Sequence, residues 1–173
     1  MNVCVDANVL GHGCNPHDLN HESSLRFLLC LLESDCKLAC NNGFSLIDQE
    51  NLSIVGREYI DNLTPGSIPA AVIAAMAQTG RLVYFDDAVD QRTRNVLNQN
   101  IPKSSDRTYA RIALNASAPL ISHDFADFSN RTRKTLLKEL ALLVLTAAQQ
   151  ADAQGCESVD QLLDRTSELL DVA

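Results

Sequence analysis

Four acidic residues lie where their side chains can act together. Asp6 and Asp124 each come shortly after an apolar run that is typical of a buried strand. Glu50 lies in a segment with a helical pattern, and Asp106 falls in the first turn of another predicted helix. Carboxylates gathered in one crevice repel one another, and oxygen ligands of this kind suit Mg²⁺ or Mn²⁺. These residues therefore predict a divalent-metal site.

Other polar residues near the acids have two interpretations each. Asp127 is either a further acid beside the metal or a helix cap, and Asp48 is a rival to Glu50. Asn8 either orients the carboxylates or caps a loop. Ser122 either hydrogen-bonds a carboxylate or a phosphate, or merely ends its strand. The sequence leaves these alternatives open.

Basic residues follow the second acidic segment, in a predicted helix. They are either contacts for a phosphate backbone or an ordinary solvated helix face. The residues in question are Arg131, Arg133, Lys134 and Lys138. His123 precedes Asp124 directly, and it would point to the opposite face if the strand continued, so we interpret it as structural.

These residues must be positioned by strands that alternate with helices. Predicted strands cover residues 2–5, 36–40, 81–85 and 118–122, and predicted helices cover 22–32, 45–62, 68–78, 89–98, 106–116, 131–139 and 159–170. Residues 140–146 are either a last strand or a buried helix. Strands separated by helices imply a parallel sheet covered on both faces, a three-layer α/β/α fold. Sites in such sheets form beyond the carboxyl ends of the strands, where the strand order reverses.

The composition is that of an ordinary globular protein. The 173 residues predict one domain, and 46% of them are apolar. We expect no membrane helix, because no run of about 18 uncharged apolar residues exists. The N-terminus lacks the features of a signal peptide, so a cytoplasmic protein is expected. The net charge of −8 argues against a large basic surface for nucleic acid, although less so if several acids bind metal.

Cysteine and histidine residues give weaker signals. Three of the six cysteines lie in apolar runs and are predicted to be reduced core residues: Cys4, Cys30 and Cys40. Two short patterns resemble metal ligands, Cys36-x3-Cys40 and the tract His12-x-Cys14-x2-His17-x3-His21. Short tracts of this kind occur by accident, so the favoured interpretation of the second is a polar loop leading into a helix.

Four segments together resemble the PIN domain family. They are Val5-Asp-Ala-Asn-Val-Leu10, Leu46-Ile-Asp-Gln-Glu50, the helix from Asp106 to Leu114, and Ile121-Ser-His-Asp-Phe-Ala-Asp-Phe128. The resemblance covers residues 1–155, and each segment alone is weak, whereas four in the same order are more specific. One departure is Asn51, which stands where the family often has Tyr or another apolar residue.

The resemblance implies a five-stranded parallel sheet of order 3-2-1-4-5 and a Mg²⁺- or Mn²⁺-dependent nuclease. Many family members are ribonuclease toxins of bacterial toxin–antitoxin pairs, so RNA and an antitoxin are the implied partners, with a homodimer as a further possibility. Two rivals stay open. One is a scaffold or binding module with a PIN fold that does not cut nucleic acid, and the retained acids argue against it. The other is a DNA-cleaving effector of a defence system.

Residues 156–173 have no counterpart in the minimal family domain and are predicted to form a helical extension. Its apolar stripe consists of Val159, Leu162, Leu163, Leu169 and Leu170. We expect this stripe to be buried against its own domain, with docking of a partner chain as the alternative.

Overall fold

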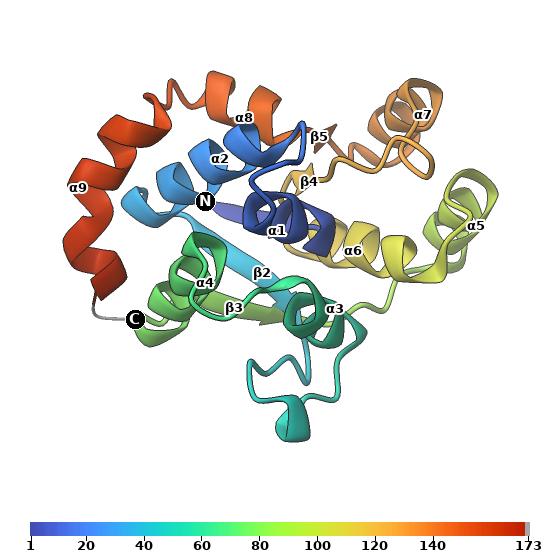
Figure 1. Cartoon of the computed structure of the whole chain (residues 1–173). Coiled ribbons are helices and arrows are strands. Elements are labelled where there is room, and N and C mark those ends of the chain that lie inside the picture. Colours follow the sequence, from blue (N-terminus) through green and yellow to red (C-terminus); the bar gives the residue numbers. More distant parts are fainter. Residues whose placement is uncertain (172–173) are drawn as a thin grey trace.

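Five parallel strands form the centre of the computed structural model, which describes residues 1–171 (Figure 1). The strands are β1 (Asn2–Val5), β2 (Lys37–Asn41), β3 (Leu82–Phe85), β4 (Leu120–Ile121) and β5 (Val144–Leu145). The last two residues of the predicted extension, 172 and 173, lie outside the described part. The ambiguous segment 140–146 thus contains a strand rather than a buried helix.

The strand order is β3-β2-β1-β4-β5, so the predicted three-layer fold and the implied order are confirmed. Strand β1 lies in the middle and pairs with β2 on one side and β4 on the other. The first crossovers move along the sheet toward β3, and the next returns to β4 on the other side of β1. The order therefore reverses between β1 and β4, where Val5 is paired with Ile121.

Helices cover both faces of this sheet. They are α1 (Ala7–Cys14), α2 (His21–Glu33), α3 (Ile54–Asn62), α4 (Ile68–Gln78), α5 (Gln91–Asn100), α6 (Ser104–Asn115), α7 (Asn130–Leu140), α8 (Ala147–Ala153) and α9 (Val159–Asp171). Helices α1 to α4 pack on one another, while α6 packs on β1, β2 and β4 and α7 packs on β5. Right-handed crossovers place these two groups on opposite faces.

Burial on both faces explains the composition of the central strands. Residues Val3–Val5 and Leu38–Cys40 are almost fully buried, and they read as unbroken apolar runs for that reason. Polar side chains cap the helices that follow these strands, Asp6 directly after β1 and Ser53 after the loop that follows β2. Asp6 and Ser53 accept hydrogen bonds from backbone N–H groups in the first turns of α1 and α3, respectively.

The C-terminal helix packs on its own domain. Helix α9 lies against α2 and α4 (Figure 1), and Leu162 and Thr166 on its inner side are fully buried. Arg26 of α2 donates hydrogen bonds to the carbonyl oxygen of Cys156 at 2.6 Å and to Asp152 at 2.7 Å. The extension is therefore part of the core structure and covers α2.

One prediction about the cysteines is wrong. Cys30 forms a disulfide with Cys156, 126 residues further along the chain, whereas Cys4 and Cys40 are free and buried as predicted. The sequence alone does not predict this pairing, because the two cysteines meet only when α2 lies beside the segment between α8 and α9.

Among the helices within residues 1–171, we find none long and apolar enough to cross a membrane.

The disulfide should contribute measurably to stability. Cys156→Ser removes a cross-link between distant parts of the chain, and such links typically contribute about 2–4 kcal/mol. We expect that loss in the free energy of unfolding, measured with urea. A reducing agent should produce the same loss in the wild type and no further loss in Cys156→Ser. Identical unfolding curves with and without reducing agent would contradict this role.

Candidate functional site

Asp6 is held at the carboxyl end of β1 by its neighbours. The Ser122 hydroxyl donates to Asp6 Oδ2 at 2.7 Å, and the Asn8 side-chain amide donates to the same oxygen at 2.9 Å. The backbone N–H of Asn8 donates to Asp6 Oδ1 at 3.1 Å. Asn8 Oδ1 in turn accepts from the backbone N–H of His123 at 3.2 Å. Asn8 and Ser122 therefore orient this carboxylate, which is one of the two roles considered for each.

Two buried tyrosines bring helices to the peptide groups on either side of Asp6. The Tyr59 hydroxyl of α3 donates to the carbonyl oxygen of Val5 at 2.6 Å. The backbone N–H of Ala7 donates to the Tyr109 hydroxyl of α6 at 3.3 Å. Both rings are fully buried. Side chains near these tyrosines on the two helices are consequently held close to Asp6.

Helix α6 delivers Asp106, which precedes Tyr109 by three residues and so shares its face of the helix. Asp106 is almost completely buried, and its Oδ1 lies 3.3 Å from the Ser105 hydroxyl and 3.5 Å from the Lys103 ammonium group. Its Oδ2 is buried and has no hydrogen-bond partner. A buried carboxylate oxygen without a partner is costly, so this atom calls for a cation or a donor.

Helix α3 delivers Glu58, the residue before Tyr59. Glu58 lines a cleft of about 160 Å³ together with three of the predicted acids, Asp6, Asp106 and Asp124. The remaining lining residues are Ala7, Asn8, Asn62 and Lys103. Four carboxylates and one ammonium group therefore face the same small space at the carboxyl ends of β1 and β4.

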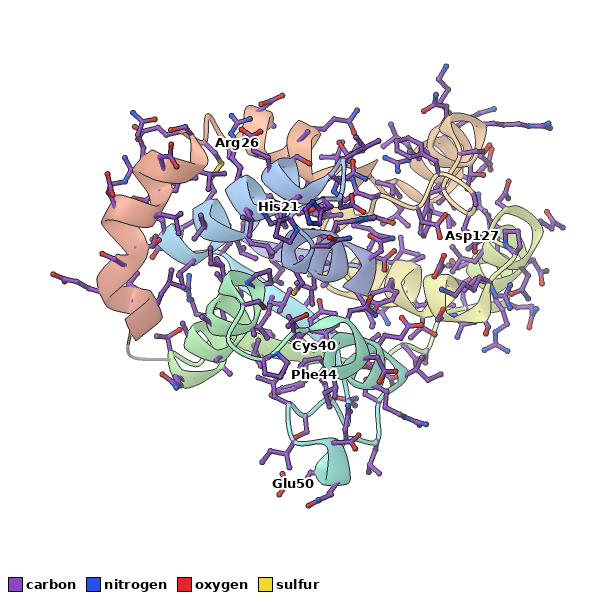
Figure 2. All side chains as sticks on the ribbon, viewed as in Figure 1. His21, Arg26, Cys40, Phe44, Glu50 and Asp127 are labelled. Atoms are coloured by element: carbon purple, nitrogen blue, oxygen red, sulfur yellow. A yellow bond between two sulfur atoms is a disulfide. The ribbon has the colours of Figure 1, made fainter. Side chains whose placement is uncertain are left out.

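Glu50 does not belong to this cleft, which corrects the predicted site. It is exposed in the single 3-10 turn η1 (Asp48–Glu50), at the tip of a loop that projects from the body (Figure 2). The first part of the predicted helix 45–62 does not form: residues 45–53 are a loop with one 3-10 turn, and Asn51 Oδ1 accepts from the backbone N–H of Ser53 at 3.1 Å. Helix α3 starts only after this turn, so Glu50 and its rival Asp48 both lie outside it.

A sequence signal for Glu58 was present. It is followed directly by Tyr59, which supplies the aromatic neighbour that Asn51 does not supply after Glu50. Lys103 was missed as well, and its signal was a position one turn ahead of Asp106.

Asp124 and Asp127 have different surroundings. Asp124 Oδ1 accepts from the backbone N–H groups of Ala126 at 2.8 Å and Asp127 at 2.9 Å, which closes a tight turn. Asp127 Oδ2 accepts from the backbone N–H of Lys103 at 2.9 Å, at the start of α6. Asp127 therefore holds the helix that carries Asp106 and is not among the residues lining the cleft.

Arg133 has a structural position, contrary to the phosphate contact considered for it. Its guanidinium group donates to the carbonyl oxygens of Phe128 at 2.7 Å and Ser122 at 3.1 Å, and reaches that of Val144 at 3.5 Å. These bonds hold α7 against the segment that ends β4. Arg131, Lys134 and Lys138 are exposed on α7, and Lys138 lies 3.9 Å from Glu139.

Burial shifts the pKa of two acids in the cleft. It raises the pKa of Asp6 to about 6, against the lowering effect of the hydrogen bonds from Ser122 and Asn8. Burial, and then the charge of Asp6, raise the pKa of Asp106 to about 7. Lys103 acts in the opposite direction, and nearby Asp127 raises the pKa further. Both acids thus resist ionisation without a further cation, which a divalent ion would supply.

The donor set fits a hard cation by its chemistry. Four carboxylates and the unpartnered Asp106 Oδ2 provide the oxygen ligands that Mg²⁺ and Mn²⁺ prefer. Within residues 1–171, however, no three His, Cys, Asp or Glu side chains are close enough to hold an ion as they stand. The acids share a cleft, and coordination would require their side chains to draw together.

In the described part of the chain, the side chains of the His/Cys tract do not come together in a group that could hold a metal ion. His12 instead pairs with Asp18, with 2.8 Å between Nδ1 and Oδ2, and its ring meets that of His123 edge to face. His123 is buried, and its Nε2 lies 3.2 Å from the Ser24 hydroxyl on α2. These contacts agree with a structural His123. The tract is not one polar loop, because His12 and Cys14 lie in α1, His17 lies in the loop that follows, and His21 starts α2.

Comparisons with known proteins give little beyond this geometry. No family model matches the chain, and no curated protein matches it. Among solved structures, the chain is similar to one in the crystal structure of VapBC2 from Rickettsia felis bound to a DNA fragment from its promoter. The identity is 13%, the match covers 84% of this chain and 98% of that one, and the TM-score is 0.41. A likeness at this level carries no argument about activity.

The buried acids should make stability fall as pH rises. The pKa of Asp106 is about 7 in the folded protein and about 4 in the unfolded one, so the folded protein binds more protons between these values. This contribution is fully present below about pH 4 and is lost as pH rises through 7. We expect Asp106→Asn to be more stable than the wild type at pH 8, in metal-free buffer, by at least about 1 kcal/mol.

The wild type must be compared with Asp106→Asn at the same pH, because His123 contributes a pH dependence of stability of the opposite sign. Burial lowers its pKa to about 4, so its contribution rises over part of the same pH range. Urea unfolding at pH 5 and pH 8, with EDTA present, measures the difference. A wild type that matches Asp106→Asn in stability at pH 8 would show that the charge of Asp106 is not costly.

Proposed function

We propose that this chain is a metal-dependent nuclease that hydrolyses phosphodiester bonds in RNA. The observation that carries the proposal is the buried, unpartnered Oδ2 of Asp106 in a cleft that three more carboxylates share. Burying several carboxylates together destabilises the folded state, and neutral side chains could fill a structural role without that loss of stability. A cation in the cleft would remove that cost.

The proposed ligands of Mg²⁺ or Mn²⁺ are Asp6, Glu58, Asp106 and Asp124. A bound ion would supply charge stabilisation at the phosphate and a water of lowered pKa. Ser122 and Asn8 keep the Asp6 carboxylate in a fixed orientation through their hydrogen bonds. Asp127 fixes the start of α6 and thereby the position of Asp106.

Lys103 would change partner during the reaction. Its ammonium group now lies near Asp106, and its side chain is more than half exposed. If Asp106 held an ion, this ammonium group would no longer be needed there and would be free to donate to a phosphate oxygen of the substrate. It would then hold the incoming chain in the cleft, in spite of the acidic surroundings.

A pair of glutamates provides a matched test. Glu58→Gln and Glu50→Gln make the same chemical change, one in the cleft and one on the exposed loop. With Mn²⁺ or Mg²⁺ and labelled single-stranded RNA, Glu58→Gln should lower the cleavage rate at least about 100-fold, because it removes an ion ligand. Glu50→Gln should cleave like the wild type, and EDTA should stop both.

Three results would contradict the proposal. Cleavage that persists in EDTA would exclude metal dependence, and equal rates in the two variants would exclude Glu58 as a ligand. Inactivity of the wild type on RNA and on DNA of the same sequence would favour the scaffold alternative. Faster cleavage of the DNA would instead favour the defence-effector alternative.

The resemblance to PIN toxins carries a narrower proposal, a toxin-type ribonuclease controlled by an antitoxin. Expression of the wild type in a bacterial host should then arrest growth, whereas Asp124→Asn should not. Co-expression of a small gene adjacent to this one should restore growth and yield a complex on purification. Normal growth with the active nuclease would contradict the toxin role while leaving the nuclease intact.

A further inference from the structure

An exposed aromatic residue directly follows one of the proposed metal ligands in the chain. Phe125 follows Asp124 and is 54% exposed. It lies at the corner of the turn that Asp124 closes through the backbone N–H groups of Ala126 and Asp127. The next aromatic residue, Phe128, is fully buried and anchors the end of this turn. The backbone under Phe125 is therefore fixed, although its ring is exposed.

Arg133 supports one face of this ring. Its guanidinium carbon lies 4.6 Å from the centre of the Phe125 ring. The same guanidinium group donates to the carbonyl oxygens of Phe128 and Ser122, so it lacks the conformational freedom of a solvent-exposed arginine. One face of the ring is thus backed by a fixed cation, and the exposed area belongs to the rest of the ring.

Exposure of an aromatic ring does not by itself bring a cation onto its face, as a second exposed aromatic residue shows. Tyr84 on β3 is 51% exposed, close to the value for Phe125. In the described part of the chain, Arg133 with Phe125 is the recorded cation–π pair, and no cation stacks on Tyr84. Strand β3 is an edge strand, separated from β1 by β2 (Figure 1), and Tyr84 is not among the residues that line the cleft.

We infer that Phe125 is a stacking platform for an unpaired base next to the phosphate in the cleft. The inference rests on the proposed function and narrows its substrate to single-stranded nucleic acid. Stacking needs an exposed, immobile π-face and no sequence-specific hydrogen bonds. A base inside a duplex has both faces covered by its neighbours and cannot use the platform. The turn that carries Asp124 would then bind the base and the ion with consecutive residues.

Binding of a fluorescent oligonucleotide tests the platform without cleavage. The probe is an eight-nucleotide RNA with one 2-aminopurine, offered with Ca²⁺ in place of Mg²⁺, and a DNA of the same sequence forms a second arm. Stacking on Phe125 should quench the 2-aminopurine. Phe125→Ala should abolish the quenching and weaken binding about 5- to 100-fold, the usual range for loss of one stacked base.

Three controls define the expected pattern. Phe125→Tyr keeps an aromatic ring and should bind within about twofold of the wild type. Tyr84→Ala removes a ring of similar exposure and should leave binding and quenching unchanged. A duplex probe should not distinguish Phe125→Ala from the wild type. In cleavage assays, Phe125→Ala should raise KM more than it lowers kcat, because the ring does not touch the reacting atoms.

The platform and the nuclease proposal fail in different ways. Wild-type binding by Phe125→Ala, absence of quenching, or no binding of either single-stranded probe by the wild type would each overturn the platform. Normal cleavage with an unchanged KM in Phe125→Ala would overturn it too, while the glutamate pair still supports the nuclease. Quenching that depends on Phe125 in a protein that cleaves nothing would support the platform and contradict the nuclease.

Discussion

The position of Asp6 between two tyrosine hydrogen bonds determines the geometry of the cleft. Tyr59 binds the carbonyl oxygen of Val5 and Tyr109 binds the N–H of Ala7, so helices from opposite faces of the sheet meet the chain on either side of one carboxylate. Glu58 and Asp106 reach the cleft because each stands on the same helix as one of these tyrosines. Strand β1 passes directly into α1 at this point, with Asp6 between them, and the tyrosines bind the peptide groups on both sides of it.

Placing carboxylates this way has an energetic cost that the surroundings offset only in part. Ser122 and Asn8 stabilise the charged form of Asp6, and Lys103 does so for Asp106, yet burial still raises the pKa of both. The hydroxyl of Ser122 and its carbonyl group have separate tasks, since the first binds Asp6 and the second binds Arg133. The segment from Ser122 to Phe128 is thus tied to the sheet, to α7 and to the cleft at once. On the proposed function, this support fixes part of the site, while the acid side chains would still have to draw together around an ion.

The parts of this site that sequence reasoning found are those fixed by local patterns. Asp6 and Asp124 follow buried strands, and Asp106 falls in a first helical turn, so short-range rules place them. Glu58 was missed because the predicted helix 45–62 contained both glutamates, whereas α3 starts only at Ile54, after the Asn51 side chain that lies against Gly56, where a Cβ would come within 2.3 Å of it. The Cys30–Cys156 pair and the carbonyl contacts of Arg133 join segments that meet only in the folded chain. No periodicity in the sequence reports contacts of that kind.

An acidic protein that binds a polyanion needs attraction from somewhere other than its net charge. The chain carries −8 overall, and Arg133 on α7 is occupied by backbone carbonyls and by the Phe125 ring. On the proposed function, the attraction comes from the ion in the cleft, the Lys103 ammonium group and stacking on Phe125, with phosphate contacts by the exposed Arg131, Lys134 and Lys138 as the alternative considered above. Few counterions would be released by so few cationic contacts, so affinity would depend only weakly on salt. Stacking is insensitive to charge, and it therefore becomes the contribution that makes binding compatible with a negative surface.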